Sequence, residues 1–155
     1  MRLATMSLCL VVFLSGCANA PPEPPAQEPP AVAIEYFPIP GGSDLPFSEA
    51  VRVGSMLYLS GQVGEDSSGV IVPGGIEAET RQTFDNIRAV LERHGSSLDR
   101  VVKCTAMLAD MTEWAAMNEV YKTYFTEHLP ARSAFGATGL ALGARLELEC
   151  WATVG

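Results

Sequence analysis

A run of prolines divides this chain into two parts that cannot share one fold. Residues 21–30 read PPEPPAQEPP, so six of these ten residues are proline. Proline fixes φ and has no backbone N–H to donate, which excludes this segment from helix interiors and central strands. The segment predicts an extended polyproline spacer, about 30 Å long at roughly 3.1 Å per residue. A proline-rich ligand for the aromatic groove of a partner is the alternative.

The residues before the spacer have the pattern of an export signal. Arg2 precedes an apolar run at residues 8–14, which is too short to span a bilayer but suits a signal peptide. The run ends in LSGC at residues 14–17, which matches the lipobox of bacterial lipoproteins, where the thiol of Cys17 takes a diacylglyceryl group. A secretory signal cleaved after residues 18–20 (ANA) is the alternative.

These features predict three parts of the chain. Residues 1–16 are expected to form a lipoprotein signal peptide, residues 17–33 the lipidated Cys17 and its linker, and residues 34–155 one domain. Two or more acyl chains would anchor the protein stably. Because Ala18 follows Cys17 where Asp would favour retention, we expect the outer membrane of a bacterial envelope, facing the periplasm. A secreted or periplasmic soluble protein is the alternative.

The region after the spacer alternates strand and helix patterns. Apolar runs and period-two alternation predict strands at residues 51–53, 56–63, 100–109, 131–137 and 145–154. Apolar positions with helical spacing predict two helices: residues 77–94, with Thr80, Phe84, Ile87 and Leu91 inward, and residues 112–128, capped by Thr112, with Trp114, Met117, Tyr121 and Tyr124 inward. This order predicts an α+β domain in which two helices pack on one mixed six-stranded sheet.

Charge and composition exclude several functions. Ten Lys and Arg face eighteen Asp and Glu, a net charge of −8, which argues against a nucleic-acid partner because phosphate binding needs basic residues. The four Cys form no C-x-x-C pair and the two His are not clustered, so no metal or redox site is predicted. We expect His94 and His128, at helix ends, to be capping cations and not bases or ligands.

Several segments beyond residue 34 resemble those of the Rid family (also called YjgF/YER057c/UK114) in order and spacing. They are LPFS at 45–48, LSGQ at 59–62, TFDNI at 83–87, NEVY at 118–121, Phe125, PARS at 130–133 and LELE at 146–149. The resemblance implies a chorismate-mutase-like α+β fold and a homotrimer with three clefts between subunits. It also implies hydrolysis of enamines and imines such as 2-aminoacrylate and 2-iminopropanoate to 2-keto acids and ammonia, without a cofactor or metal.

The resemblance assigns roles to individual residues. Arg132 is expected to bind the substrate carboxylate, because its planar fork matches a carboxylate in bidentate fashion. Glu147 is expected to deprotonate the attacking water and pass a proton to the leaving nitrogen. Further substrate contacts are implied for Phe47, Ser60, Gly61 and Ser133, and a structural hydrogen bond at the subunit interface for Asn118. By strand alternation Glu149 shares a face with Glu147, and we expect it to be solvated.

Two positions depart from the pattern of this family. Phe47 stands where its best-studied deaminases carry Tyr, and Ala134 where they often carry Cys. Neither change touches Arg132 or Glu147. The loss of the tyrosine hydroxyl suits a larger or more apolar imine.

Two cysteines fall within the expected sheet. By strand parity Cys104 and Cys150 are predicted to face the same helix-covered layer. We expect buried free thiols, because adjacent strands often miss the torsion of a disulfide. In an oxidising compartment a disulfide is the alternative.

Two functions of different classes follow. The first is an exported deaminase of 2-imino acids, and the second a non-catalytic envelope module that binds a small carboxylate in the same cleft. A structural envelope protein is a third reading, for which the sequence offers no positive feature.

Overall fold

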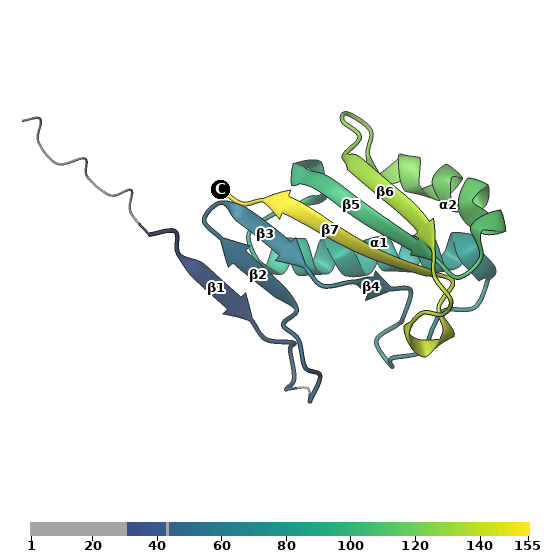
Figure 1. The fold of residues 1–155 in the computed structure, drawn as a ribbon, viewed down its shortest axis with the longest axis horizontal. Coiled ribbons are helices and arrows are strands. Elements are labelled where there is room, and N and C mark those ends of the chain that lie inside the picture. The colour runs from purple at the N-terminus through teal and green to yellow at the C-terminus, as the bar shows by residue number, and fades with distance from the viewer. Residues whose placement is uncertain (1–30, 43) are drawn as a thin grey trace, which may run out of the picture. The chain divides into compact units, whose positions relative to one another are not determined.

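The strands of the computed structural model form one mixed sheet of seven strands (Figure 1). The structure describes residues 31–42 and 44–155, so the predicted signal peptide, Cys17 and the proline spacer lie outside the described residues. The main path runs β1-β2-β3-β7-β5-β6, and β4 pairs with β7 beside it. Among the strands of the described residues, β5 and β6 pair in parallel and the other pairs are antiparallel. The strands are β1 (Ile34–Phe37), β2 (Ala50–Val53), β3 (Met56–Leu59), β4 (Gln62–Val63), β5 (Val101–Leu108), β6 (Ala131–Gly136) and β7 (Leu146–Thr153).

Both α-helices, α1 (Gly75–Arg93) and α2 (Trp114–Tyr121), lie on one face of the sheet (Figure 1). Four 3-10 turns accompany them: η1 (Leu98–Arg100), η2 (Met111–Glu113), η3 (Lys122–Tyr124) and η4 (Ala141–Gly143). The predicted α+β architecture is confirmed. Within residues 31–42 and 44–155, no helix combines the length and the apolar character needed to cross a bilayer.

The predicted strand at residues 56–63 is divided into β3 and β4, and β1 lies outside every predicted strand range, so the described sheet has seven strands and not the predicted six. Ser60 causes the break. Its backbone N–H donates to the Glu49 carbonyl at 3.0 Å and its hydroxyl to the Ser48 carbonyl at 2.7 Å, so both groups are bonded outside the ladder with β7. Pairing with β7 resumes at Gln62.

The second helix is shorter than the predicted range of residues 112–128. The turn η2 precedes it, and Asp110 and not Thr112 caps this turn, because the Asp110 carboxylate accepts the Thr112 N–H at 2.8 Å. Glu113, the N-cap residue of α2, makes no side-chain cap hydrogen bond. At its end the Thr123 hydroxyl donates to the Val120 carbonyl at 2.7 Å. This side chain competes with backbone N–H groups for a carbonyl of the helix, and the chain continues as the 3-10 turn η3. The prediction that Trp114 faces inward is wrong, since its side chain is 43% exposed.

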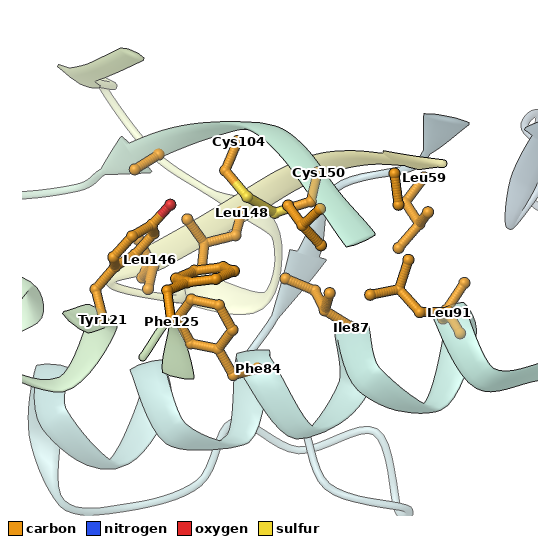
Figure 2. Packing of buried hydrophobic residues seen from close by; sticks show 14 of the residues in the cluster. Leu59, Phe84, Ile87, Leu91, Cys104, Tyr121, Phe125, Leu146, Leu148 and Cys150 are labelled. Atoms are coloured by element: carbon orange, nitrogen blue, oxygen red, sulfur yellow. A yellow bond between two sulfur atoms is a disulfide. The ribbon is translucent and has the colours of Figure 1, made fainter. Parts of the chain in front are cut away.

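The core lies between α1 and the sheet. Figure 2 shows Phe84 and Ile87 of α1 pointing toward the side of the sheet that carries Leu148 of β7, and Leu91 pointing toward Leu59 of β3, and all five of these residues are buried. At the end near α2, Phe84 meets Tyr121 and Phe125, with ring centroids 5.3 and 5.6 Å away. The inward positions predicted for α1 are confirmed.

A disulfide joins Cys104 of β5 to Cys150 of β7 inside this core (Figure 2). The two residues are direct partners in the antiparallel ladder, with Cα atoms 4.2 Å apart, and both are fully buried. So short a separation is typical of non-hydrogen-bonded pairs, whose side chains lie closest together. The predicted face is confirmed, but the prediction of two free thiols is wrong.

We expect Cys104 and Cys150 to resist alkylation in denatured protein that has not been reduced. The bond closes a loop of 46 residues, for which the chain-entropy relation gives about 4 kcal/mol of stabilisation. Replacing both residues with Ala should therefore lower the free energy of unfolding by several kcal/mol, measured by chemical denaturation against oxidised and reduced wild type. Alkylation of both thiols in the unreduced protein would contradict this result.

Candidate active site

Arg132 and Glu147 lie on opposite faces of the sheet. Arg132 is the direct partner of Cys104 in the parallel pairing of β5 and β6, so it shares the helix-covered face with that buried cysteine. Glu147 alternates along β7 with the fully buried Leu146 and Leu148, so it points to the face without helices. One chain therefore does not bring the two expected catalytic residues into a single cleft.

The guanidinium of Arg132 packs on aromatic rings. Its central carbon lies 4.4 Å from the ring centroid of Tyr121 and 6.0 Å from that of Trp114, and both residues belong to α2. The side chain is half-buried and makes no ion pair or hydrogen bond with any described residue. A half-buried cation without a counter-ion is suited to bind an anion from outside the chain.

A pocket of about 310 Å³ opens beside Arg132. Its lining is mostly apolar and includes Asn118, Tyr121, Lys122, Leu129, Pro130 and Arg132. Asn118 is half-buried and makes no side-chain hydrogen bond within the described part of the chain, so the bond expected of it at the subunit interface stays a prediction. The pocket thus presents one guanidinium and one amide in apolar surroundings, a fitting arrangement for a small carboxylate.

Tyr121 forms one wall of this pocket, a role that the sequence did not indicate. It is 5% exposed, and its buried hydroxyl has no hydrogen-bond partner among the described residues. Burial raises the pKa of Tyr121 to about 12, although the nearby charge of Arg132 acts in the opposite direction. Tyr121 follows Asn118 by three residues on one helix face, and this spacing is the signal that links the two to one site.

Glu147 lies directly against Gly61. A Cβ atom at position 61 would be 1.9 Å from Glu147 Oε1, so only glycine leaves room for the carboxylate. Ser60 comes just before this contact. Its hydroxyl proton is donated to the Ser48 carbonyl, which leaves only its oxygen lone pairs for another group. The structure therefore places Glu147 against Gly61, and Ser60 precedes this contact in the chain.

The environment of Glu147 favours its protonated form. Partial burial is the main cause that raises the pKa of this carboxyl, and the neighbouring charge of Glu149 adds to it. A raised pKa makes the carboxylate a stronger base, which is better matched to taking a proton from water. Glu149 is half-buried and not fully solvated as expected, and it accepts the indole N–H of Trp151 at 2.7 Å.

The other two residues expected to contact the substrate, Phe47 and Ser133, lie in different parts of the structure. Phe47, 52% exposed, lines a second pocket of about 300 Å³ together with Tyr36 and Ser48, and Ser48 links that pocket to Ser60. Ser133 lies on the face opposite to Arg132, because it follows Arg132 in β6, and its hydroxyl accepts a hydrogen bond from Lys103 at 2.8 Å. Ser133 is therefore not beside the guanidinium in the same chain.

The histidines stand apart from these groups. His94 is the C-cap residue of α1, as predicted, where its Nε2 lies 2.8 Å from a Glu49 carboxylate oxygen and its ring stacks on Phe37. His128 is exposed in the loop before β6 and not at a helix end. Among the residues that the structure describes, no group of three or more His, Cys, Asp or Glu could hold a metal ion.

This chain is similar to known proteins in both sequence and fold. A family model described as Endoribonuclease L-PSP matches residues 42–154. A curated 2-iminobutanoate/2-iminopropanoate deaminase of Mus musculus is 46% identical over 111 residues, 71% of this chain and 82% of the relative. Its Homo sapiens counterpart is 41% identical over 111 residues, 71% of this chain and 81% of the relative. The solved structure of YyfA from Yersinia pestis, a Rid protein, has a TM-score of 0.73 and 33% identity, and the match covers 79% of this chain and all of that one.

Proposed function

This chain belongs to the Rid family, whose model is described as Endoribonuclease L-PSP, and from that premise we propose that it is a deaminase of 2-imino acids. It would hydrolyse them to 2-keto acids and ammonia without a cofactor. Relatives with this named activity are 41–46% identical over most of the chain. The observation that carries the proposal is Arg132, a half-buried cation without a counter-ion in the described chain, beside a pocket that fits a small carboxylate.

The reaction follows from the chemistry of the two site residues. Arg132 donates two N–H bonds to the substrate carboxylate and so fixes the neighbouring imine carbon. Glu147 takes a proton from a water molecule, whose oxygen attacks that carbon to give a carbinolamine. With the imine nitrogen protonated at the outset, the proton held on Glu147 passes to the amine nitrogen of the carbinolamine. Glu147 takes the hydroxyl proton as the C=O bond forms and the C–N bond breaks, and ammonia leaves the 2-keto acid.

The description of the family model names a ribonuclease, but the charges of this chain favour a small acid. A ribonuclease would bind successive phosphates, whereas the chain carries eighteen acidic against ten basic residues. The pocket beside Arg132 offers one guanidinium without a carboxylate partner among the described residues, whereas its lysine, Lys122, pairs with Glu119, and its walls are mostly apolar. That arrangement suits a single carboxylate.

The opposite faces of Arg132 and Glu147 support a site shared between two copies of the chain. We assign Arg132 and Asn118 of one subunit and the partner's Glu147 to each cleft. The face without helices also carries a row of cross-strand partners, Tyr36, Val51, Tyr58 and Trp151. Tyr36 is 68% and Trp151 38% exposed, and an exposed apolar sheet face of this kind is typical of an interface.

We expect the domain from residue 31 onward to be a homotrimer. Burying this row and completing three clefts both require neighbouring copies, and a closed ring satisfies every copy equally. Light scattering coupled to gel filtration at micromolar concentration should give three times the chain mass. A stable monomer at that concentration would contradict the shared cleft.

The activity can be tested with an imine that is generated in situ. An amino-acid oxidase converts an L-amino acid to its 2-imino acid, and the release of keto acid and ammonia is followed with and without the protein. We expect the protein to raise the rate above spontaneous hydrolysis. Equal rates of product release with and without the protein, for several imines, would contradict the proposal.

A non-catalytic carboxylate-binding module is the second candidate. The same Arg132 pocket favours it, because binding needs the arginine and not Glu147. Binding of a 2-keto acid without turnover of any imine would identify this function.

We propose that the protein is exported and anchored by lipid on Cys17, at the outer membrane facing the periplasm. The lipobox sequence supports this location, and so does the disulfide between Cys104 and Cys150, because such bonds persist in oxidising compartments. Cys17→Ser should move the protein from the membrane fraction to the soluble fraction. Unchanged fractionation would contradict the anchor.

A further inference from the structure

Arg132 differs from five other arginines of the described chain in what holds its side chain. Arg52 pairs with Glu35 at 2.5 Å, Arg88 with Asp85 at 2.8 Å, and Arg145 with Glu113 at 2.5 Å. Arg93 pairs with Glu49 and Arg81 with Glu77 in the same way. In place of a carboxylate, Arg132 has the rings of Trp114 and Tyr121.

The carboxylates closest in sequence to these rings are already engaged by other cations. Glu119 on α2 pairs with Lys122 at 2.5 Å, and Glu113, just before α2, pairs with Arg145. Trp114 and Tyr121 are seven residues apart, which is two helical turns, so α2 presents both rings on one side. This helix therefore supplies Arg132 with aromatic surface and no negative charge.

An aromatic ring and a carboxylate contact different parts of a guanidinium. A ring attracts the cation through its face, at distances up to about 6 Å, while the N–H donors point outward in the guanidinium plane. A carboxylate would occupy those donors and cancel the charge. Aromatic packing therefore orients Arg132 and leaves its bidentate fork free.

We propose that Trp114 and Tyr121 form an aromatic slot that positions Arg132 for the substrate carboxylate. This inference rests on the proposed function and goes beyond it by assigning two positioning residues that act through Arg132. The slot explains the 43% exposure of Trp114, whose indole packs toward the guanidinium and not into the core. Tyr121 contributes its ring and not its hydroxyl, which is fully buried and has no partner among the described groups.

The test compares binding and turnover in full-length wild type and three variants. Trp114→Leu should raise the Kd for 2-oxobutanoate, measured by calorimetry, and the KM for the matching imine by about fivefold, with kcat within about twofold of wild type. Trp114→Phe should restore most of the affinity, because it returns a ring to the slot. Arg88→Gln, which removes a guanidinium from the ring of Tyr124, is the control and should change neither constant.

Each outcome decides between the slot and the activity. An unchanged Kd in Trp114→Leu, or a fall in its kcat at constant KM, contradicts the aromatic slot. Turnover by the wild type in the same assay still supports the deaminase. Without wild-type turnover the deaminase fails, yet the Kd comparison still supports or overturns the slot. If wild type binds no 2-oxobutanoate at all, the slot is overturned as well.

Discussion

Arg132→Ala is expected to lower kcat/KM for a 2-imino acid by at least tenfold, and up to several hundredfold. The change removes charge-assisted hydrogen bonds worth about 1.5–3 kcal/mol each, and about 1.4 kcal/mol corresponds to a factor of ten. Arg132→Lys should recover little, since an ammonium reproduces neither the two-pronged contact nor the flat surface that packs on Tyr121.

The control for this variant is Arg100→Ala, which removes an exposed arginine at the end of η1, outside the expected cleft. It should leave kcat/KM unchanged in the same oxidase-coupled assay. Turnover near wild type in Arg132→Ala would contradict the role of this residue in carboxylate binding.

Glu147→Gln is expected to lower kcat by about 10²–10⁴-fold while the Kd for a 2-keto acid stays the same or falls. The amide keeps the shape that fits against Gly61 but can neither take a proton from water nor return one to nitrogen. Rapid kinetics and calorimetry on the same preparation separate chemistry from binding. A loss of binding with normal kcat would contradict the assigned role.

The pH profile gives an independent check on Glu147. Because burial and Glu149 raise the pKa of this carboxyl, kcat/KM should rise with pH through a value above the ordinary range of Glu. Glu149→Gln removes the second cause, so it should move this acidic limb to lower pH and leave the maximal rate nearly unchanged. A limb that stays in place would show that Glu149 does not act on Glu147.

Local patterns predicted most of the fold but not its details. The 3.6-residue period of Phe84, Ile87 and Leu91 was sufficient for α1, because all three pack in the core. The division at Ser60 depended on hydrogen bonds to the backbone carbonyls of Ser48 and Glu49. These residues lie outside the short window over which a strand period is read, so the sequence pattern at 56–63 could not indicate the break. The disulfide depended on the ladder register that sets Cys104 opposite Cys150, and strand parity alone does not determine register.

The resemblance to the Rid family indicated the residues of the site but not how one chain arranges them. Whether Arg132 faces the helices depends on how β6 pairs with β5, and a shift of one residue would reverse it. The aromatic surroundings of Arg132 likewise depend on where α2 packs. Trp114 and Tyr121 had the spacing of core residues, and only the packed structure distinguishes a core ring from one that holds a guanidinium.

The central claim is that each cleft takes Arg132 from one subunit and Glu147 from another, and hybrid trimers test it most directly. Arg132→Ala and Glu147→Gln chains with different tags are expressed together, and trimers that contain both are purified through the two tags. In a ring of three, every such hybrid has one cleft with both residues intact, so we predict about a third of the wild-type kcat per trimer. Hybrids as inactive as either variant alone, in preparations shown to contain both chains, would contradict a site shared between subunits.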